Sequence, residues 1–512
     1  MSFSDQRDPS NGLGAQQRWL IYSLLIAVAL GQAAGKILAV NSVDLSRLES
    51  YRIGETLARE TAKLERQGLA GDELAAAVAE RRETLEHDMR LQRPFLSAND
   101  RSRWMAIRAI AENGNHDIDP FLEEPTWDSI DMVQHLGRDG ERHQYSSKPP
   151  LLMVLIAGPY WLLMQLTGTT LGESPYDLGR ALLLLLNCGS LAVMLVAIGR
   201  IIERTGVGDI DRLFAMTVAT FATQLAAFMP VLNNHLFGAA AAAVTCDLWQ
   251  RLLRSDKPLG GVSLGAGLAA GFAVTCELPA LALAVLVGLS LLWRRPGETL
   301  RAFAVGAGLV AVAFFATNYW AHDSLRPPYG HRSETDPADN WYDYEYTVGG
   351  KTRDSYWRHR QGIDIGEESK AVYALHTLVG HHGVFSMTPV WLLSFVGMGL
   401  LLSSRDGATR QLAVVTVLIT AACLVFFILL RPQDDRNYGG ATNGFRWLFW
   451  LAPLWIAMLP RAVASLRQSR VGMALAASLL AWSAMSASYP TWNPWTHPWI
   501  YRWMEHLGFS VL

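Results

Sequence analysis

Residues 141–152 read ERHQYSSKPPLL, a polar segment that ends in Lys148-Pro149-Pro150 and runs directly into apolar sequence. Proline cannot continue a helix from the preceding residues, but it suits a first helical turn. The segment therefore predicts an embedded helix that begins at the two prolines, with Lys148 at the membrane edge. A lysine held there can bind a lipid phosphate, or it can simply extend its ammonium group to the interface, and the motif alone leaves both roles open.

The composition is that of a polytopic membrane protein. Of the 512 residues, 50% are hydrophobic, the mean hydropathy is +0.15, and 18 tryptophans fit interfacial belts. The net charge of −2 shows no basic excess, so we expect no nucleic-acid partner; membrane lipids and small polar molecules are the expected partners. Apolar runs without metal-ligand spacing contain the cysteines, which we expect to be packing residues: Cys188, Cys246, Cys276 and Cys423.

Eleven apolar segments predict membrane-spanning helices, each near the roughly 17–25 residues that a bilayer requires. The first is longer than the apolar region of a typical signal peptide and is expected to be an uncleaved anchor. Several connections are short and basic, and the positive-inside rule places them all in the cytoplasm. The expected spans are 19–40, 180–202, 212–231, 236–253, 261–277, 279–293, 300–321, 388–404, 411–430, 445–463 and 470–488.

Residues 150–166 are apolar enough for another span, but counting them would invert every later basic loop. We therefore expect an interfacial or re-entrant helix, and Gly158-Pro159 in its middle agrees with that interpretation. The same parity predicts a cytoplasmic tail at 1–18 and a second large outer loop at 322–387. It places these regions outside: 41–149, 232–235, 322–387, 431–444 and the carboxyl tail 489–512.

The first outer loop has two parts. Residues 45–92 are rich in Ala, Leu, Glu and Arg and are interrupted at 68–71, which predicts a charged helical hairpin. In residues 97–119, Asn99-Asp100 stands at an expected helix start, apolar positions follow, and Gly114 marks the end. Asp100 is either a helix N-cap or a functional carboxylate.

These features together resemble the C-type membrane glycosyltransferases, especially the lipid A aminoarabinose transferases and the protein O-mannosyltransferases. The resemblance rests on the acid that opens a short helix in the first outer loop, the loop that closes on Lys-Pro-Pro, the embedded helix and the paired spans. It covers roughly residues 19–321 and is looser beyond them, although the large outer loop after the seventh span also fits. It implies an all-α membrane protein with about eleven transmembrane helices, juxtamembrane helices in the first outer loop, and a catalytic module at 19–321. The expected location is a bacterial inner or cell membrane, with the active site facing outward.

Enzymes of this family use polyprenyl-phosphate sugars as donors, so the resemblance implies sugar transfer to a lipid, glycan or protein acceptor. Asp100 is the expected catalytic base, and Lys148 is expected at the donor phosphate. The donor carries its own activated bond, so no organic cofactor is implied; a divalent metal stays open. Two departures weaken the match. Ser147 stands where the family often has an acid, and residues 232–235 (LNNH) stand where it has a second acid.

Further polar residues at the expected outer edges are candidates for substrate contact. Arg431 and Arg436 are predicted ligands of the donor phosphate, with headgroup anchoring as the alternative. Glu277 lies between two short spans, where a carboxylate either faces a cavity or reaches water. The histidine spacings match no strong metal template, and turn formation is the alternative at 233–235. The predicted substrate-binding residues are Asn99, His143, Tyr145, Asn233, Asn234, His235, Glu277, His381 and His382.

Two other functions stay open. A secondary transporter or lipid flippase also uses buried charges and broken helices, but such proteins commonly carry internal repeats. No repeat is evident, and polar sequence is concentrated in two large outer loops, which favours an enzyme. An inactive scaffold of the same fold is favoured by the missing second acid.

Overall fold

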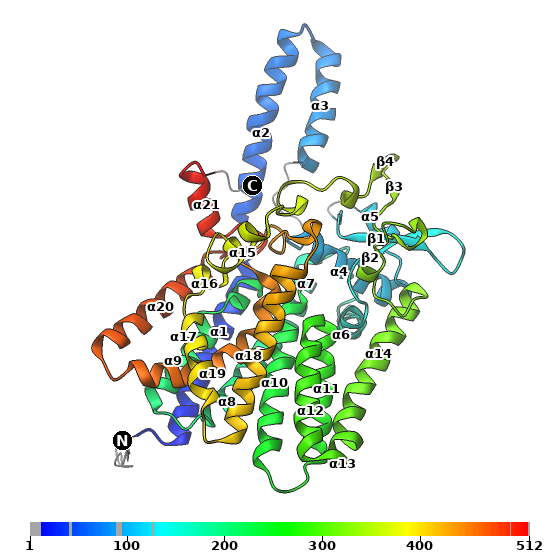
Figure 1. Cartoon of the computed structure of the whole chain (residues 1–512). Helices are drawn as coiled ribbons and strands as arrows, with labels where there is room; N and C mark the ends of the chain where they lie inside the picture. The colour runs from blue at the N-terminus through cyan, green and yellow to red at the C-terminus, as the bar shows by residue number, and fades with distance from the viewer. Residues whose placement is uncertain (1–11, 40–42, 89–94, 125–126, 492, 510–512) are drawn as a thin grey trace. The chain divides into compact units, whose positions relative to one another are not determined.

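The computed structural model describes residues 12–39, 43–88, 95–124, 127–491 and 493–509. The chain divides into two compact units, which are described separately. Helices dominate both (Figure 1), so the predicted all-α class is confirmed; the described residues add two short β-hairpins that were not predicted. Unit 1 comprises residues 1–36, 183–317 and 360–512, and unit 2 comprises 37–182 and 318–359.

Apolar helices of spanning length make this chain an integral membrane protein. Four further apolar helices are shorter, at 10–17 residues, and the predicted total of eleven spans therefore stays a prediction. Within the described residues, six helical stretches are long and apolar enough to cross a membrane: Ala15–Ala39, Pro175–Glu203, Pro296–His322, Gly407–Leu430, Arg446–Leu466 and Arg470–Ser488.

In unit 1, α10 packs against α8 and α11, and α17 packs against α19. The approach of η6 to α11 requires Gly267, where an added methyl group would overlap the carbonyl oxygen of Phe303. The helices of unit 1 are α1 (Ala15–Ala39, whose end enters unit 2), η3 (Leu184–Cys188), α8 (Gly189–Glu203), α9 (Asp209–Phe221), η4 (Gln224–Phe228), α10 (Asn234–Arg254), α11 (Gly260–Cys276), η5 (Leu278–Ala280), α12 (Leu281–Arg294), α13 (Pro296–Glu298), η6 (Thr299–Phe303), α14 (Ala304–His322, whose end enters unit 2), η10 (Gly362–Ile365), α15 (Lys370–Leu378), α16 (Val384–Met387), α17 (Trp391–Leu402), α18 (Gly407–Leu424), η11 (Val425–Leu430), η12 (Gln433–Asp435), η13 (Arg446–Leu451), α19 (Ala452–Leu466), α20 (Arg470–Ser488) and α21 (Trp499–His506).

The prediction of one continuous span at 212–231 is wrong. Helix α9 ends at Phe221, the backbone at Thr223 is extended, and the short helix η4 follows. Buried Gln224 donates to the Thr388 hydroxyl at 3.4 Å, so the chain leaves helical geometry where a polar side chain bonds another element. Asn187 donates to the carbonyl oxygens at 229 and 231, which satisfies backbone groups that the irregular segment leaves without helical partners.

Hydrogen bonds join several of the basic loops predicted to share one side of the membrane. Arg254 Nη2 lies 2.5 Å from Asp406 Oδ2, and Arg295 Nη1 donates to the carbonyl oxygen of Lys257 at 2.8 Å. These loops therefore lie at one end of unit 1, as a common side requires.

Unit 2 confirms three local predictions of the sequence. The charged hairpin forms from two packed helices, α2 and α3, the helix after residue 97 ends with Gly114 in left-handed geometry (φ 71°), and a helix starts directly after Pro150. The elements are α2 (Val43–Arg66), α3 (Gly71–Asp88), α4 (Ala98–Arg108), η2 (Ala109–Asn113), α5 (Asp119–Leu122), β1 (Met132–Leu136), β2 (Arg142–Ser146), α6 (Leu151–Thr167), α7 (Pro175–Leu183, whose last residue enters unit 1), η7 (Pro328–Gly330), η8 (Pro337–Asp339), β3 (Glu345–Val348), β4 (Lys351–Asp354) and η9 (Tyr356–Arg358).

A buried arginine fastens α4 to the elements around it. Arg108 pairs with Glu112 at 2.9 Å and with Glu124 at 2.6 Å. Glu112 also accepts a hydrogen bond from the Tyr160 hydroxyl of α6 at 2.5 Å. The α4–η2 helix and α6 are thereby held together, which positions the helix that follows the Lys-Pro-Pro sequence.

Candidate active site

Helix α4 carries Asp100 in its first turn. Ser97 is the N-cap, with an extended backbone and a hydroxyl that accepts the backbone N–H of Asp100 at 3.0 Å. The alternative that Asp100 itself caps the helix is therefore wrong. The Asp100 side chain is fully buried, and its Oδ1 accepts a hydrogen bond from the Trp104 indole nitrogen, one turn later, at 3.0 Å.

The first β-hairpin brings a second carboxylate to the Lys-Pro-Pro loop. Strands β1 and β2 are antiparallel, and Met132 is paired with Ser146. The next residues outward are Asp131 and Ser147, and the Ser147 amide donates to the Asp131 carbonyl oxygen at 3.4 Å. Sequence reasoning missed Asp131. Asp139-Gly140 between two alternating segments is a strong hairpin signal and would have placed Asp131 beside Lys148.

Asp131 is the centre of a buried polar cluster. Lys148 Nζ lies 2.7 Å from Asp131 Oδ2, and Asn99 Nδ2 donates to the same oxygen at 2.7 Å. The Ser147 hydroxyl donates to Asp131 Oδ1, and the Ser102 hydroxyl donates to the Asp131 carbonyl oxygen at 2.7 Å. One carboxylate thus joins the start of α4 to the Lys-Pro-Pro loop, so two segments that the sequence singled out separately are brought together.

Asp131 and Lys148 form a charged pair. Burial acts to raise the pKa of Asp131, but the Lys148 ammonium group and the hydrogen bonds from Ser147 and Asn99 together outweigh it and lower that pKa to about 2. Asp131 is therefore ionised at neutral pH and keeps Lys148 in place. Ser147, the residue before Lys-Pro-Pro, is not an acid, and the carboxylate beside the lysine comes from residue 131 instead.

A second polar cluster lies near the turn of the same hairpin. His143 Nδ1 lies 2.9 Å from Asp119 Oδ2 and 3.3 Å from Asp117 Oδ2, and His143 Nε2 lies 2.8 Å from Asp139 Oδ2. Burial acts to lower the pKa of His143, but hydrogen bonds to Asp139 and Asp119 and the nearby carboxylate charges raise it to about 9. Burial and the Asp117 charge raise the pKa of Asp119 to about 6.

A polar cavity of about 270 Å³ lies beside this second cluster and is contained within unit 2. Tyr145, a predicted substrate-binding residue, lines it and stacks on His135 with ring centres 4.1 Å apart. His143, Asp117, His116 and His322 line it as well. The cavity is thus rich in carboxylates and imidazoles, which are groups that bind cations and hydrogen-bond donors.

In unit 1, three predicted residues meet where α10 begins and α11 ends. Glu277 Oε1 accepts hydrogen bonds from Asn234 Nδ2 at 2.9 Å and lies 2.5 Å from His235 Nδ1. Arg446 Nη1 lies 3.3 Å from the other ring nitrogen of His235. Asn233 is the N-cap of α10, and its side chain accepts the backbone N–H of Leu236 at 3.2 Å, so this residue performs the turn role weighed for 233–235.

The other predicted residues of unit 1 have protein contacts of their own. The Arg431 guanidinium lies 3.8 Å from the centre of the Trp447 ring, and Arg436 Nη1 donates to the carbonyl oxygen of Glu368 at 2.6 Å. His381 and His382 are buried with their Nδ1 atoms 2.5 Å apart. These contacts leave the predicted phosphate and substrate roles of the four residues as predictions.

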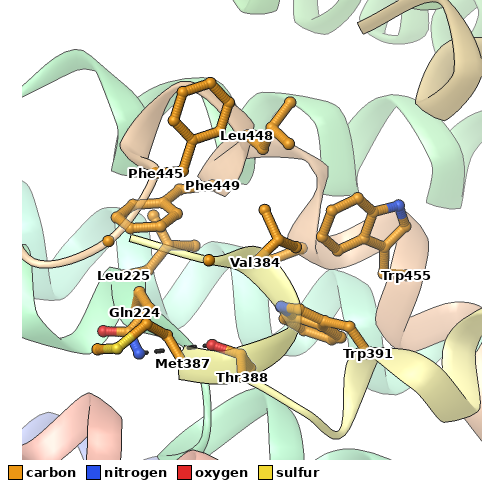
Figure 2. Close-up of a pocket in the computed structure, with 13 residues that line it drawn as sticks. Gln224, Leu225, Val384, Met387, Thr388, Trp391, Phe445, Leu448, Phe449 and Trp455 are labelled. Carbon is orange, nitrogen blue, oxygen red and sulfur yellow. Dashed lines mark hydrogen bonds between the residues drawn. The ribbon is translucent and has the colours of Figure 1, made fainter. Parts of the chain in front are cut away.

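Unit 1 also contains an apolar pocket near η4, α16 and α19 (Figure 2). Its accessible space is only about 20 Å³, which is room for little more than one water molecule. Val384, Trp391 and Phe449 line it, and the hydrogen bond from Gln224 to Thr388 crosses one edge. A pocket this narrow and apolar does not supply the polar groups that sugar or phosphate chemistry requires.

Comparisons with known proteins return structural similarity only. No family model and no curated protein sequence matches the chain. The chain is similar in structure to the Archaeoglobus fulgidus oligosaccharyltransferase in complex with zinc and sulfate, with 14% sequence identity, a TM-score of 0.42, and coverage of 80% of this chain and 52% of that one. It is also similar to the archaeal oligosaccharyltransferase AglB from Archaeoglobus fulgidus in complex with an inhibitory peptide and a dolichol-phosphate, with 11% identity, a TM-score of 0.42, and coverage of 81% and 54%. This chain therefore spans about half the length of those solved structures.

Proposed function

We propose that the protein transfers a sugar from a polyprenyl-phosphate donor to a lipid, glycan or protein acceptor. Asp100 acts as the base, and Lys148 contacts the donor phosphate. The observation that carries the proposal is the bridge through Asp131, whose Oδ2 lies 2.7 Å from both Asn99 Nδ2 and Lys148 Nζ. This bridge fixes a cation at the start of apolar α6, next to the helix turn that contains Asp100.

The proposed reaction needs a base for the acceptor and a cation for the leaving group. Asp100 takes the proton of the acceptor hydroxyl or amine, the acceptor atom bonds to the anomeric carbon, and the bond from that carbon to the phosphate oxygen breaks. The electron pair stays on the phosphate, where the Lys148 ammonium group stabilises it. Because Asp100 is fully buried, the proposal includes a rearrangement of the surrounding side chains when the acceptor binds.

Membrane-edge residues complete the proposed assignment of roles. Asn99, Asn233, Asn234, His143, Tyr145, His235, Glu277, His381 and His382 are proposed substrate contacts, and Arg431 and Arg436 are proposed further ligands of the donor phosphate. The proposed location is a bacterial inner or cell membrane with an outward-facing site. Single-cysteine labelling in intact cells tests this orientation: residues 140, 330 and 435 should label from outside, and 257, 297 and 407 from inside. Labelling of positions 140 and 172 from opposite sides would make α6 a true span and reverse the predicted parity.

The direct test measures polyprenyl phosphate released when the purified protein, in lipid nanodiscs, is mixed with a polyprenyl-phosphate sugar and an acceptor extract. The wild type should release it, and Asp131→Asn should release it more slowly because Lys148 loses the charge that positions it. Asp354→Asn is the matched control, since Asp354 is an exposed carboxylate of the same unit paired with Arg358 at 2.7 Å. A transporter would move the donor across the bilayer without releasing lipid phosphate. An inactive scaffold would bind the donor and release nothing, and either outcome would refute the proposal.

A further inference from the structure

The cluster near the hairpin turn has the composition of a metal centre. Asp117, Asp119 and His143 each offer one ligand atom, and the three atoms lie within 4.8 Å of one another. A divalent ion bound by two carboxylate oxygens and one imidazole nitrogen needs ligand atoms that converge in this way. We infer that Asp117, Asp119 and His143 form a binding site for a divalent transition-metal ion. The inference does not rest on the proposed sugar transfer, although His143 is also one of the proposed substrate contacts.

The orientation of His143 separates this cluster from an ordinary ion pair. Its Nδ1 faces Asp119 and Asp117 at 2.9 and 3.3 Å, while its Nε2 lies 2.8 Å from Asp139. An imidazole that binds a metal through one nitrogen typically donates its other N–H to a carboxylate, which fixes the ring and makes it a better ligand. Asp139 occupies that supporting position. The Nδ1 atom of His143 is therefore free to bind a metal between Asp117 and Asp119, while its Nε2–H is held by Asp139.

The local fold holds the ligands in place. The Asp119 Oδ1 atom accepts the backbone N–H of Gln144 at 2.9 Å, which leaves its Oδ2 directed to His143. Gly137 has space for no side chain, because an added methyl group would lie 2.8 Å from both Asp139 Oδ1 and the His143 ring. The turn and strand β2 are thus packed tightly around His143, as a preformed site requires.

Two more imidazoles independently indicate a ligand at the adjoining cavity. His116 and His322 are only 7% and 6% exposed and line the same cavity as Asp117 and His143. The Nε2 atom of each has no hydrogen-bond partner among the described residues. Buried polar atoms without partners are rare and call for an explanation. A hydrated metal ion supplies one, because its water ligands donate hydrogen bonds to imidazole nitrogens.

The protonation pattern identifies the His322 nitrogen as an acceptor. His135 Nδ1 lies 2.9 Å from the Leu136 carbonyl oxygen, so it is a donor and His135 Nε2 is an acceptor. His322 Nδ1, at 3.0 Å from His135 Nε2, must then carry the proton. Its own Nε2 therefore presents a lone pair, which suits a metal-bound water molecule or the metal itself.

The charges of the surrounding side chains favour a cation that carries more than one positive charge. Three carboxylates, Asp117, Asp119 and Asp139, surround a single imidazole, while the nearby Arg138 is paired with Asp323 at 2.9 Å. A mixed set of oxygen and nitrogen ligands suits Zn²⁺ or Mn²⁺ better than the all-oxygen preference of Ca²⁺ or Mg²⁺. Bound there, the ion would tie the start of α5 and the residues just before it to strand β2.

The test measures Zn²⁺ binding by the full-length, tag-free protein after chelator treatment, using equilibrium dialysis and metal analysis. The wild type should bind one Zn²⁺ per chain at this site. Removal of a ligand in His143→Gln or Asp119→Asn should weaken binding at least 10-fold, and Asp139→Asn should weaken it by about 10–100-fold, the usual effect of losing a group that orients a ligand. The matched control is His359→Gln. His359 is an exposed imidazole of the same unit, and it lies beside one carboxylate, Asp354, at the long distance of 3.9 Å, rather than in a cluster of ligands.

A second measurement keeps the inference testable if these variants do not fold. Zn²⁺ should shift the imidazole resonances of His143 in histidine-selective NMR of the wild type, while those of His359 stay unchanged. Wild type that binds no Zn²⁺, variants that bind it as tightly as wild type, or His143 resonances that Zn²⁺ leaves unchanged would each overturn the assignment.

Discussion

The two ends of the β1–β2 hairpin hold carboxylates under opposite charge conditions. At the open end, Asp131 is matched by Lys148 at 2.7 Å, and its pKa falls to about 2. Near the turn, three carboxylates share His143, whose pKa rises to about 9. One end thus holds a fixed ammonium group, and the other has carboxylates in excess.

This difference in charge indicates which kind of ligand each end of the hairpin can bind. A lysine held by one buried carboxylate is a positioned cation, which suits a phosphate. Carboxylates in excess of their cationic partners attract a further positive charge, which suits a metal ion. The same short hairpin therefore presents an anion site at its open end and a cation site near its turn. Variants at either end, or in the turn between them, test this difference.

The largest expected effect is at the open end, in Asp100→Asn. Asparagine is a far poorer base than aspartate, so transfer should fall by roughly 10²–10⁴-fold. Its side-chain oxygen can still accept the hydrogen bond that the Trp104 indole now donates at 3.0 Å, so thermal stability should stay close to wild type. Turnover of the donor lipid and thermal unfolding measure the two quantities.

Ser97→Ala is the matched control for this variant. It removes the N-cap of α4 and should cost about 0.5–2 kcal/mol of stability, without a comparable loss of turnover. Normal turnover in Asp100→Asn would remove Asp100 from the chemistry, and the base would have to be sought at Glu277 or elsewhere.

Lys148→Ala should come second in size. It removes a charge-assisted contact worth about 1.5–3 kcal/mol, which corresponds to roughly 10–150-fold weaker donor use. Lys148→Arg should restore part of it, because guanidinium also binds phosphate. Donor affinity and turnover are the measurements.

Arg142→Ala, which removes a positive charge from an exposed position on β2, should change neither quantity. Donor use that is unchanged in Lys148→Ala would leave that residue as an interface anchor only.

Near the turn, the carboxylates around His143 should raise its measured pKa. Its pKa should lie near 9 in metal-free protein, and Asp139→Asn should lower it toward the ordinary value of about 6.5. Because the folded-state pKa is raised, the stabilisation from His143 is fully present below pH 6.5 and is lost as the pH rises through about 9. Histidine-selective NMR measures the pKa, and a value near 6.5 in wild type would contradict the geometry of this cluster.

Local signals in the sequence predicted much of unit 2 and only part of the candidate site. The prolines at 149 and 150 gave the start of α6, and Gly114 gave the end of the α4–η2 helix, because these residues act through their own backbone geometry. Asp131 was missed because its role depends on strand pairing with residues later in the chain, and the hairpin signal at Asp139-Gly140 was not used to predict that pairing. The break in the span at 212–231 was missed for a related reason, because the buried Gln224 side chain bonds Thr388, far away in the sequence.

The smallest expected effect tests whether the hairpin couples its two ends. Gly140 has φ 87° in the turn and nothing lies within 4 Å of where a side chain would begin, so Gly140→Ala introduces backbone strain without a clash. The cost should be about 1–2 kcal/mol, and Gly140→Asn should cost less because asparagine tolerates left-handed geometry. The ion pair at the open end also holds the register of β1 and β2, and Asp119 of α5 holds β2 at Gln144, so both variants should keep donor use and Zn²⁺ binding within a few-fold of wild type. Thermal unfolding measures the loss of stability. Donor turnover reports on the open end of the hairpin, and Zn²⁺ binding reports on the turn end. A loss at both ends together would mean that the turn sets the register on its own, and the anion and cation sites would then depend on one another through the strands between them.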